Sequence, residues 1–396
     1  MFFSVLSIIF IKVRINVKWE QHKLGEVVSV FDGTHQTPNY KTKGIMFLSV
    51  ENINTLLSNK YISENEYRQR FKIKPQYLDV FMTRIGTIGK TNVITTHKPI
   101  AYYVSLALLR PQNIQSFFLS FIIQTSKVQQ DIWKRTLQIA FPQKINKDEI
   151  GKVTLALPLQ KEQIDIEKLL LKLDKLITLQ QRKLEQLKLL EKAHQQKLFP
   201  NSFQEKPLLR ILHGDNSWWN SYIGEVFTER VDKGSSEKLL SVSITDGVYP
   251  FDESKRKNNS SDDKHNYKKV FQNDIAYNSM RLWQGALGVS KYEGIVSPAY
   301  TVLKPLPNQN SIFYEFMFKN IDMLHIFQRN SQGLTSDTWN LKFNQLQHIK
   351  IKTTNLNSQN KIAKLLIKIE ELKNNESNYY HNLMTLKKYL LQKLFL

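Results

Sequence analysis

The chain has 396 residues, of which 41% are hydrophobic and 23% charged, a length that favours two globular units and a composition that excludes a wholly disordered chain. It contains no cysteine, which excludes disulfides, thiolate zinc sites and a cysteine nucleophile. The net charge of +21 favours a polyanionic partner, with nucleic acid first, although a lysine-rich surface that only interacts with solvent is the alternative.

The chain begins with an apolar run over residues 1–11. This run has no basic segment before it and no small-residue cleavage site after it, and it is too short to span a bilayer. We therefore predict an atypical N-terminal extension over residues 1–16, with a targeting segment as the alternative. The rest of the chain is expected to be cytoplasmic.

Short apolar and β-branched runs alternate with turn residues between positions 17 and 157. They predict strands near residues 45–50, 80–83, 93–96 and 104–109. Apolar residues at helical spacing over 117–133 predict one helix packed on the sheet. This segment is therefore predicted to be a first domain of mixed α and β structure.

Residues 158–200 are predicted to be dominated by one long helix, because positions 160–198 contain neither glycine nor proline. At 1.5 Å per residue such a helix would span roughly 55 Å. Its apolar residues recur at heptad-like spacing. The predicted contact residues of this helix are Ile166, Leu170, Leu173, Ile177, Leu184 and Leu187.

The second half of the chain has the same plan. A linker is predicted over residues 201–215, a second domain over 216–353 and a second long helix over 354–396. The basic segment 255–269 is either a phosphate clamp or a solvated surface. The predicted contact residues of the second helix are Ile362, Leu366, Ile369, Tyr380, Leu383 and Leu390.

The two halves are related by a tandem duplication. Gln-Lys-Leu-Phe occurs at residues 196–199 and again at 392–395, an offset of 196. Each half also opens on a tryptophan followed by Leu/Ile-Gly-Glu-Val, at residues 24–27 and 223–226. We expect a mixed α/β (α+β) fold in which the two helices pair antiparallel as a coiled-coil-like spacer, so that one chain imitates a homodimer.

Catalytic signatures are missing from the sequence. Residues 84–91 end like a phosphate-binding loop, but Arg84 stands where that motif requires glycine, so we reject nucleotide binding there. The sequence has no Asn-Pro-Pro-aromatic run for amino-methylation and no histidine spacing typical of a metal site. We predict no catalytic and no metal-binding residues.

Two segments carry a resemblance to a known family. One is Leu-Pro-Leu-Gln-Lys-Glu-Gln at residues 157–163, and the other is Ser-Met-Arg-Leu-Trp-Gln-Gly-Ala-Leu-Gly-Val-Ser at 279–290. With the duplication, they make the chain resemble the specificity subunit of Type I restriction-modification enzymes. Residues 356–360, Leu-Asn-Ser-Gln-Asn, depart from the family pattern, which has a proline and Glu-Gln there.

The resemblance implies a non-catalytic subunit of a DNA methyltransferase and endonuclease complex. Each half would contain a target recognition domain that reads one half of a bipartite duplex target. The helices would set the spacing and hold two modification subunits, which the restriction subunits join. S-adenosylmethionine would belong to the modification subunit, and ATP and Mg to the restriction subunit. The alternatives are a self-contained DNA methyltransferase or nuclease, and a DNA-binding scaffold without sequence preference.

Basic and amide side chains in turn-rich segments are the candidates for DNA contact, because they can bind phosphates and base edges. Trp283 and Gln284 are left unassigned between packing and insertion against a base. The candidates of the first half are His35, Gln36, Asn39, Lys41, Lys43, Arg68, Arg70 and Arg84. Those of the second half are Lys255, Arg256, Lys257, Lys264, Asn266 and Arg281.

Overall fold

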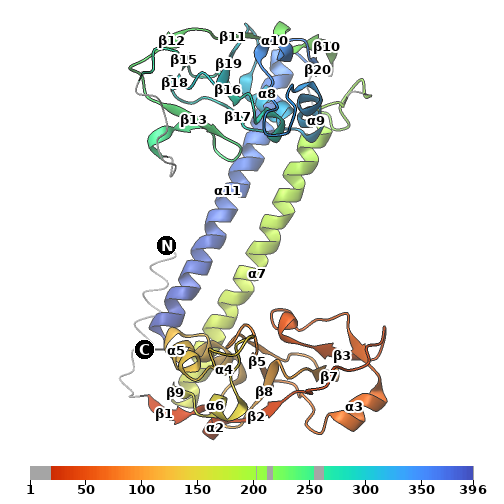
Figure 1. Cartoon of the computed structure of the whole chain (residues 1–396), viewed down its shortest axis with the longest axis vertical. Helices are drawn as coiled ribbons and strands as arrows, with labels where there is room; N and C mark the ends of the chain where they lie inside the picture. The colour runs from red at the N-terminus through yellow and green to blue at the C-terminus, as the bar shows by residue number, and fades with distance from the viewer. Residues whose placement is uncertain (1–18, 202, 212–216, 254–262, 396) are drawn as a thin grey trace. The chain divides into compact units, whose positions relative to one another are not determined.

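A computed structural model describes residues 19–201, 203–211, 217–253 and 263–395. The chain forms two compact units: the first combines the chain up to Gln180 with the residues from Tyr379 onward, and the second is Gln181–Asn378. Each unit contains an α/β body and a segment of both long helices, α7 (Gln160–Lys197) and α11 (Leu356–Lys393) (Figure 1). The predicted extension over residues 1–16 lies outside the described residues.

The first unit is built on a four-stranded antiparallel sheet in the order β2–β8–β5–β6. Every residue of β5 is buried, so its sequence is a continuous run of non-charged residues and not an alternating one. The prediction placed β5 correctly, but it began β6 two residues and ended it three residues too late. The strands are β2 (Val28–Asp32), β8 (Leu106–Pro111), β5 (Val80–Thr83) and β6 (Thr91–Val93).

Two helices, α4 (Ser116–Ile123) and α5 (Ser126–Lys134), replace the single helix predicted over residues 117–133. Thr125 between them has an extended backbone, and its hydroxyl donates a hydrogen bond of 2.7 Å to the carbonyl of Ile122. A β-branched residue that satisfies a carbonyl at the helix end favours a break. The apolar spacing continues through the break, which is why the single-helix prediction was wrong.

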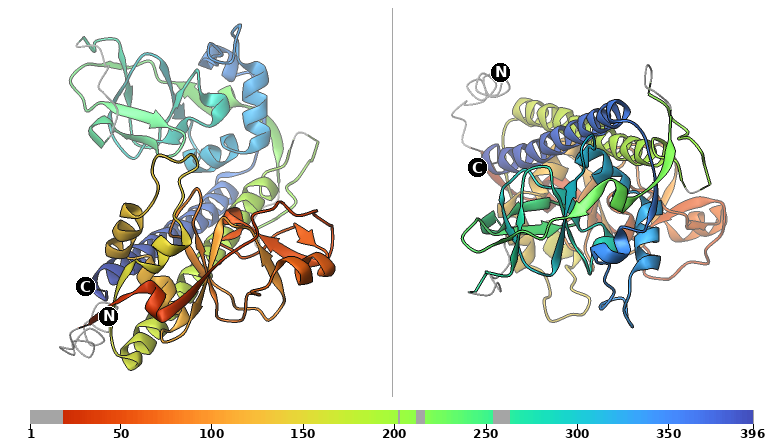
Figure 2. Two further views of the ribbon diagram at one scale, coloured as in Figure 1. Left: turned by 60° about the horizontal axis from the view of Figure 1, so that its bottom comes forward. Right: turned by 90° about the horizontal axis from the view of Figure 1, so that it is seen from above.

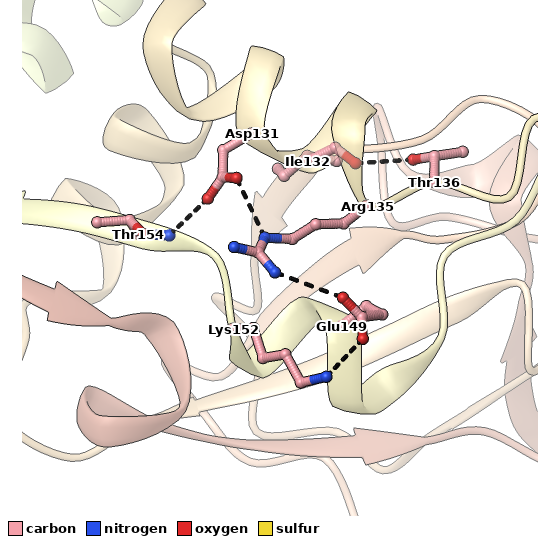
Figure 3. Close-up of polar contacts among 7 residues, drawn as sticks. All are labelled: Asp131, Ile132, Arg135, Thr136, Glu149, Lys152 and Thr154. Carbon is pink, nitrogen blue, oxygen red and sulfur yellow. Dashed lines mark hydrogen bonds and ion pairs between the residues drawn. The ribbon is translucent and has the colours of Figure 1, made fainter.

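A polar network joins α5 to α6 (Lys147–Gly151) and β9 (Thr154–Leu157) (Figure 3). Arg135 donates to Asp131 at 3.1 Å and to Glu149 at 3.4 Å. Asp131 also accepts the backbone N–H of Thr154 at 2.8 Å. The Lys152 ammonium, with a smaller contribution from Arg135, lowers the pKa of Glu149. The network fixes the chain directly before and after residues 136–145.

A second sheet, in the order β4–β3–β7, completes the first body with its own buried aromatic core. Here β3 runs parallel to β7 and antiparallel to β4. Ser63 caps the following helix by accepting the N–H of Glu66 at 3.2 Å. The elements are β3 (Ile45–Leu48), η1 (Val50–Asn52), β4 (Tyr61–Ile62), α3 (Glu64–Arg70) and β7 (Ile100–Tyr102).

The chain enters the first body through β1 (Glu20–Lys23), which pairs with β9, and α2 (Leu24–Val27). A Cβ on Gly25 would lie 3.2 Å from the carbonyl oxygen of Gly151. A Cβ on Gly224, its counterpart in the second half, would lie 2.9 Å from a side-chain carbon of Gln347. Close approach of the backbone therefore explains why both halves begin with the same glycine.

The second unit repeats the frame of the first. Its main sheet has the order β11–β19–β16–β17, with the same antiparallel pairings, and a terminal pair β10–β20 matches β1–β9. The elements of the frame are β10 (Trp219–Tyr222), η2 (Ile223–Glu225), β11 (Phe227–Glu229), β16 (Ile275–Asn278), η4 (Leu282–Gln284), β17 (Leu287–Val289), β19 (Tyr300–Pro305), α8 (Ser311–Phe318), α9 (Ile321–Asn330), α10 (Phe343–Leu346) and β20 (Lys350–Thr353).

The second sheets of the two bodies differ. In the second unit the order is β12–β15–β18, and the central strand is antiparallel to both neighbours, whereas β3 and β7 are parallel. The second unit also has a hairpin of β13 and β14, and η3, that the first lacks among its described residues. These elements are β12 (Lys233–Gly234), β13 (Leu240–Ser243), β14 (Gly247–Pro250), η3 (Phe251–Glu253), β15 (Tyr267–Val270) and β18 (Gly294–Val296).

The long helices pair antiparallel within each unit, as predicted. In the second unit, Lys183 of α7 pairs with Glu376 of α11, and Glu191 pairs with Lys373 at 2.7 Å. Residue numbers increase along α7 while those of the paired residues on α11 decrease, which shows that the helices are antiparallel. In the first unit, Lys387 of α11 lies 2.6 Å from Asp174 of α7. Lys373, Glu376 and Lys387 occupy polar positions of the heptad-like pattern, so ion pairs fill the gaps in the apolar contact.

The predicted helix-contact residues lie inside this pairing and in the adjoining body cores. Leu170 and Leu173 of α7 share one buried cluster with Leu383 and Leu390 of α11. All twelve predicted residues are buried except Leu187 and Tyr380, which are half-buried; the others are Ile166, Leu170, Leu173, Ile177, Leu184, Ile362, Leu366, Ile369, Leu383 and Leu390.

The repeated Leu-Phe at the end of each helix packs on the body formed by the other half of the sequence. Phe395 follows α11 and contacts Trp19 and Phe118 of the first body, with ring centroids 6.0 and 5.2 Å apart. Phe199 follows α7 and contacts Phe313 of the second body at 5.3 Å. This exchange explains why each compact unit contains parts of both long helices.

A buried glutamine fixes the start of each long helix to its body. Gln163 donates to the carbonyl of Pro158 at 3.0 Å and accepts the N–H of Gln115 at 3.2 Å. Gln359, 196 positions later, donates to the carbonyl five residues before it at 2.7 Å and accepts the N–H that precedes α8 at 2.9 Å. The segment that departed from the family pattern therefore keeps the same side chain and the same pair of bonds.

Candidate nucleic-acid interface

The loop that joins β2 to β3 brings five candidates together at the surface. Thr34 donates its N–H to the carbonyl of Tyr102 at 3.1 Å, and Lys41 donates its N–H to that of Tyr61 at 2.8 Å. These bonds tie both ends of the loop to the second sheet of the first unit. All five candidates on this loop have exposed side chains: His35, Gln36, Asn39, Lys41 and Lys43.

Two further candidates lie on α3, which begins directly after β4, the strand beside this loop. Arg68 and Glu64 are 3.6 Å apart, and Arg70 and Glu66 are 2.9 Å apart, both one helical turn apart. The side chain of Arg68 is 75% exposed and that of Arg70 39%. The pair of Arg68 with Glu64 is exposed on both sides and contributes little to stability, so the guanidinium of Arg68 can exchange its carboxylate for another anion at small cost. The side chain of Glu66 is only 13% exposed, so the pair with Arg70 is not of this kind.

Arg84, in contrast, is only 6% exposed. Its guanidinium pairs with Asp32 and donates to the carbonyl of Ile145 at 3.1 Å. It therefore holds the end of β5 to two distant segments and does not join the surface formed by the β2–β3 loop and α3. The nearby Gly86 and Gly89 donate their N–H groups to the carbonyls of Gln143 and Thr83, each at 2.9 Å.

Three of the six candidates of the second unit lie in the described part of the chain: Lys264, Asn266 and Arg281. Lys255, Arg256 and Lys257 lie outside the described residues. Lys264 is half-buried, and exposed Asn266 accepts a hydrogen bond of 2.8 Å from the ammonium of Lys233. Asn266 immediately precedes β15, so this pair lies on the sheet whose topology differs from that of the first unit.

Arg281 lies on the glycine turn that follows β16. Its guanidinium is 3.7 Å from the carboxylate of Asp337. Half-buried Trp283 on the same turn donates to the carbonyl of Met280 at 3.2 Å and meets Trp339 edge-on, with ring centroids 5.4 Å apart. Trp283 is therefore packed against the protein and is not exposed for stacking on a base. Gln284 is also half-buried.

Each body contains a buried aspartate paired with an arginine; Arg110 lies in β8, and Arg230 directly follows β11. Asp79 accepts from Arg110 at 2.8 Å, and Asp274 accepts from Arg230 at 2.6 Å. The hydrogen bonds that each arginine donates to its carboxylate are the main cause that raises the pKa of the arginine. Both aspartates also accept a backbone N–H three residues earlier in the chain, at 2.9 Å. These pairs brace the frame and leave neither arginine free for DNA.

Equivalent cavities of about 240 and 170 Å³ lie where α5 and α9 meet the ends of the long helices. Gln21, Val128 and Phe395 line the first, and Asn220, Met323 and Phe199 occupy the same positions in the second. None of the candidate DNA-binding residues lines either cavity. Among the described residues, no cluster of three or more His, Asp or Glu side chains could hold a metal ion.

The exposed apolar residues of two loops went unnoticed in the sequence. Ile139 and Phe141 follow α5, Leu334 follows α9, and all three are fully exposed. The offset of 195 between Ile139 and Leu334 could have indicated them, because α4 and α8 have the same offset. Their exposure itself depends on the tertiary structure.

Within the described part of the chain, no helix combines the length and apolar character needed to cross a bilayer. No curated protein sequence matches the chain significantly. The Type I restriction modification DNA specificity domain, as a family, matches residues 16–189.

Solved structures show the same fold over nearly the full length. A Type-I restriction-modification system S subunit from M. genitalium has a TM-score of 0.61 at 12% identity, covering 96% of this chain and 97% of that chain. A chain from a structure on complex assembly and conformational transition of the type I R-M system has a TM-score of 0.54 at 12% identity, covering 96% and 98%. Residues 16–189 therefore match the Type I restriction modification DNA specificity domain, and the chain has, over nearly its full length, the fold of these Type I S subunit structures.

Proposed function

We propose that this chain is the DNA-binding specificity subunit of a Type I restriction-modification complex and reads a bipartite duplex target, one half with each unit. The observation that carries the proposal is the contrast between the two bodies. Their main sheets have the same order and pairings, whereas their second sheets differ in strand direction. A shared frame with different second sheets suits two domains that recognise different half-site sequences.

The loop candidates belong to these second sheets, which supports their assignment to DNA. His35, Gln36 and Asn39 supply hydrogen-bonding groups for base edges, and Lys41 and Lys43 supply charge for phosphates. In the second unit, Lys264 and Asn266 hold the corresponding place beside β15. Lys255, Arg256, Lys257 and Arg281 remain in the proposed set, and Arg84 is a structural residue.

The proposed role of the long helices is to set the distance between the half-sites and to hold two modification subunits. Two half-sites one helical turn apart lie about 34 Å from centre to centre, which a helix pair of this length can bridge. Leu176 and Leu372 occupy equivalent positions on α7 and α11 and are 44% and 42% exposed. Each offers the same apolar contact to one of two identical partners.

Catalysis is proposed to lie in the partner subunits. S-adenosylmethionine would be bound by the modification subunits, and ATP and Mg by the restriction subunits that join them. This chain would supply recognition alone.

Mapping of methylated bases after co-expression with candidate modification subunits tests the proposal. We expect methylation within two short words separated by a spacer of fixed length and variable sequence. An uninterrupted target would contradict two separate readers. Purified chain that methylates or cuts DNA by itself would favour a self-contained enzyme, and equal binding to all duplexes at moderate salt would favour a scaffold without sequence preference.

Replacing Lys41 and Lys43 with alanine should weaken binding to all duplexes alike and lower the slope of log affinity against log salt by about one for each lost phosphate contact. Binding titrations at several salt concentrations measure both effects. Lys172→Ala, at an exposed position of α7, is the matched control and should leave the slope unchanged. An unchanged slope in the double variant would remove this loop from the phosphate contacts.

A further inference from the structure

Each unit carries a loop that exposes apolar side chains at its tip. We call residues 136–145 and 331–341 the tip loops; they follow α5 and α9 and project from the bodies of their own units (Figure 2). Ile139 and Phe141 in the first, and Leu334 in the second, are fully exposed. Ile139 and Leu334 occupy equivalent positions, at the offset of 195. A fully exposed branched aliphatic side chain thus occurs at the equivalent position of both tip loops.

The tip loops begin in the same way. The hydroxyl of Thr136 donates to the carbonyl of Ile132 at 2.8 Å, and the hydroxyl of Ser331 donates to that of Phe327, also at 2.8 Å. In the first unit, Arg135 beside this bond joins the network that spans α5, α6 and β9 (Figure 3). The start of each loop is therefore fixed to a packed helix.

The tip loops also end in the same way. The N–H of Ile145 donates to the carbonyl of Arg84, and the N–H of Leu341 donates to that of Ser279, both at 2.9 Å. Ile145 and Leu341 are fully buried. The guanidinium of Arg84 donates back to the carbonyl of Ile145 at 3.1 Å, which gives this arginine its structural role.

Hydrogen bonds across each loop hold its two sides together. Leu137 donates its N–H to the carbonyl of Lys144 at 2.8 Å, and Gln332 and Asn340 exchange two backbone bonds of 2.9 and 2.8 Å. A Cβ on Gly333 would lie 2.6 Å from the carbonyl oxygen of Thr338, so the residue before Leu334 must be glycine. Both tips are thus built on fixed bases.

The residues around the exposed apolar side chains indicate which kind of partner the tip loops contact. In the second tip loop, Leu334 is the one fully exposed large apolar residue, and the residues from Thr335 to Thr338 are polar. A stable protein interface needs about 800 Å² on each partner, which one projecting side chain does not provide. Insertion between two stacked base pairs needs a single apolar side chain, and the basic chain draws the duplex to it.

We propose that the tip loops are wedges whose apolar side chains insert between stacked base pairs of the DNA, Leu334 at one half-site and Ile139 with Phe141 at the other. This inference rests on the proposed function, because it requires that each unit meets DNA. Arg281, which follows β16 and pairs with Asp337 of the second tip loop, would contact the adjoining phosphate or base edge. Insertion unstacks and kinks the duplex beside each half-site.

Permanganate oxidation of unstacked thymines tests the wedges. The full chain, assembled with its modification subunits, is bound to a duplex carrying the mapped target, with thymines placed through and beside both half-sites. We expect reactive thymines at each half-site with the parent chain. Leu334→Ser should abolish the reactivity at one half-site alone, and the Ile139→Ser, Phe141→Ser double variant at the other alone.

Matched controls separate the wedge from general surface effects. Val231 and Leu57 are 70% and 68% exposed and lie outside the tip loops, so Val231→Ser and Leu57→Ser should retain full reactivity. Full reactivity in the tip variants, or no reactive thymine with the parent chain bound to its target, would overturn the wedges. Loss of subunit assembly in the tip variants with unchanged reactivity would assign the tips to protein contact. Failure of the parent assembly to bind any target selectively would instead overturn the proposed function.

Discussion

Replacing Leu170 with alanine is expected to lower the free energy of unfolding by roughly 2–5 kcal/mol, because the side chain is fully buried and its loss leaves a cavity. Leu170 joins α7 to the first body and to the end of α11 in one cluster. Leu366 holds the equivalent position in the second unit, is 1% exposed, and should cost about the same. Urea unfolding followed by circular dichroism measures both losses.

Leu189→Ala is the matched control for these variants. Leu189 lies on α7 but is 69% exposed, so its replacement should change the free energy of unfolding by no more than about 0.5 kcal/mol. If all three variants lost the same stability, burial would not govern the effect, since alanine is the better helix former at each position. Leu170→Ala and Leu366→Ala without measurable loss would contradict the antiparallel packing described for each unit.

Replacing Asp274 with alanine is expected to cost about 3–5 kcal/mol, because it removes the buried carboxylate that accepts two hydrogen bonds from Arg230 and leaves only the exposed Asp232 beside the guanidinium. The side chain of Asp274 is 1% exposed and that of Arg230 11%, so water cannot replace the lost carboxylate. Asp79→Ala should cost less, since its partner Arg110 is 27% exposed and can be hydrated. Denaturant unfolding of both variants measures the difference.

Asp232→Ala provides the control within the same cluster. Asp232 also pairs with Arg230, at 3.0 Å, but its side chain is 59% exposed, so its removal should cost no more than about 1 kcal/mol. Adding Arg230→Met to Asp274→Ala should restore part of the stability, because no charge is then left buried. A double variant less stable than Asp274→Ala alone would show that the arginine stabilises the fold by packing.

The sequence predicted the long helices well. Their apolar residues recur at heptad-like spacing without glycine or proline, and α7 ends one residue before the predicted end. The duplication predicted that two similar frames would form, and the sheet orders of the two units agree with it. Local pattern and repeated sequence are sufficient for these features, because a helix face or a strand is specified by neighbouring residues.

The contacts that a residue makes with distant parts of the chain could not be predicted in the same way. Arg84 had the sequence of a surface candidate on a glycine turn, but its partners Asp32 and Ile145 are 52 and 61 residues away. Residues 117–133 had an unbroken helical pattern, but one hydroxyl at Thr125 divides them. The ion pairs between α7 and α11 likewise depend on which residues the antiparallel pairing brings opposite each other.

The sequence by itself thus determined two duplicated α/β bodies, two long helices and a strongly basic chain. Only the tertiary structure decided that Phe199 and Phe395 pack on the bodies of the opposite halves, and that Ile139, Phe141 and Leu334 are left exposed. The physical reason is that periodicity reports which side of a local element is apolar. Whether that side is covered depends on segments that are distant in the sequence and meet only when the chain has folded.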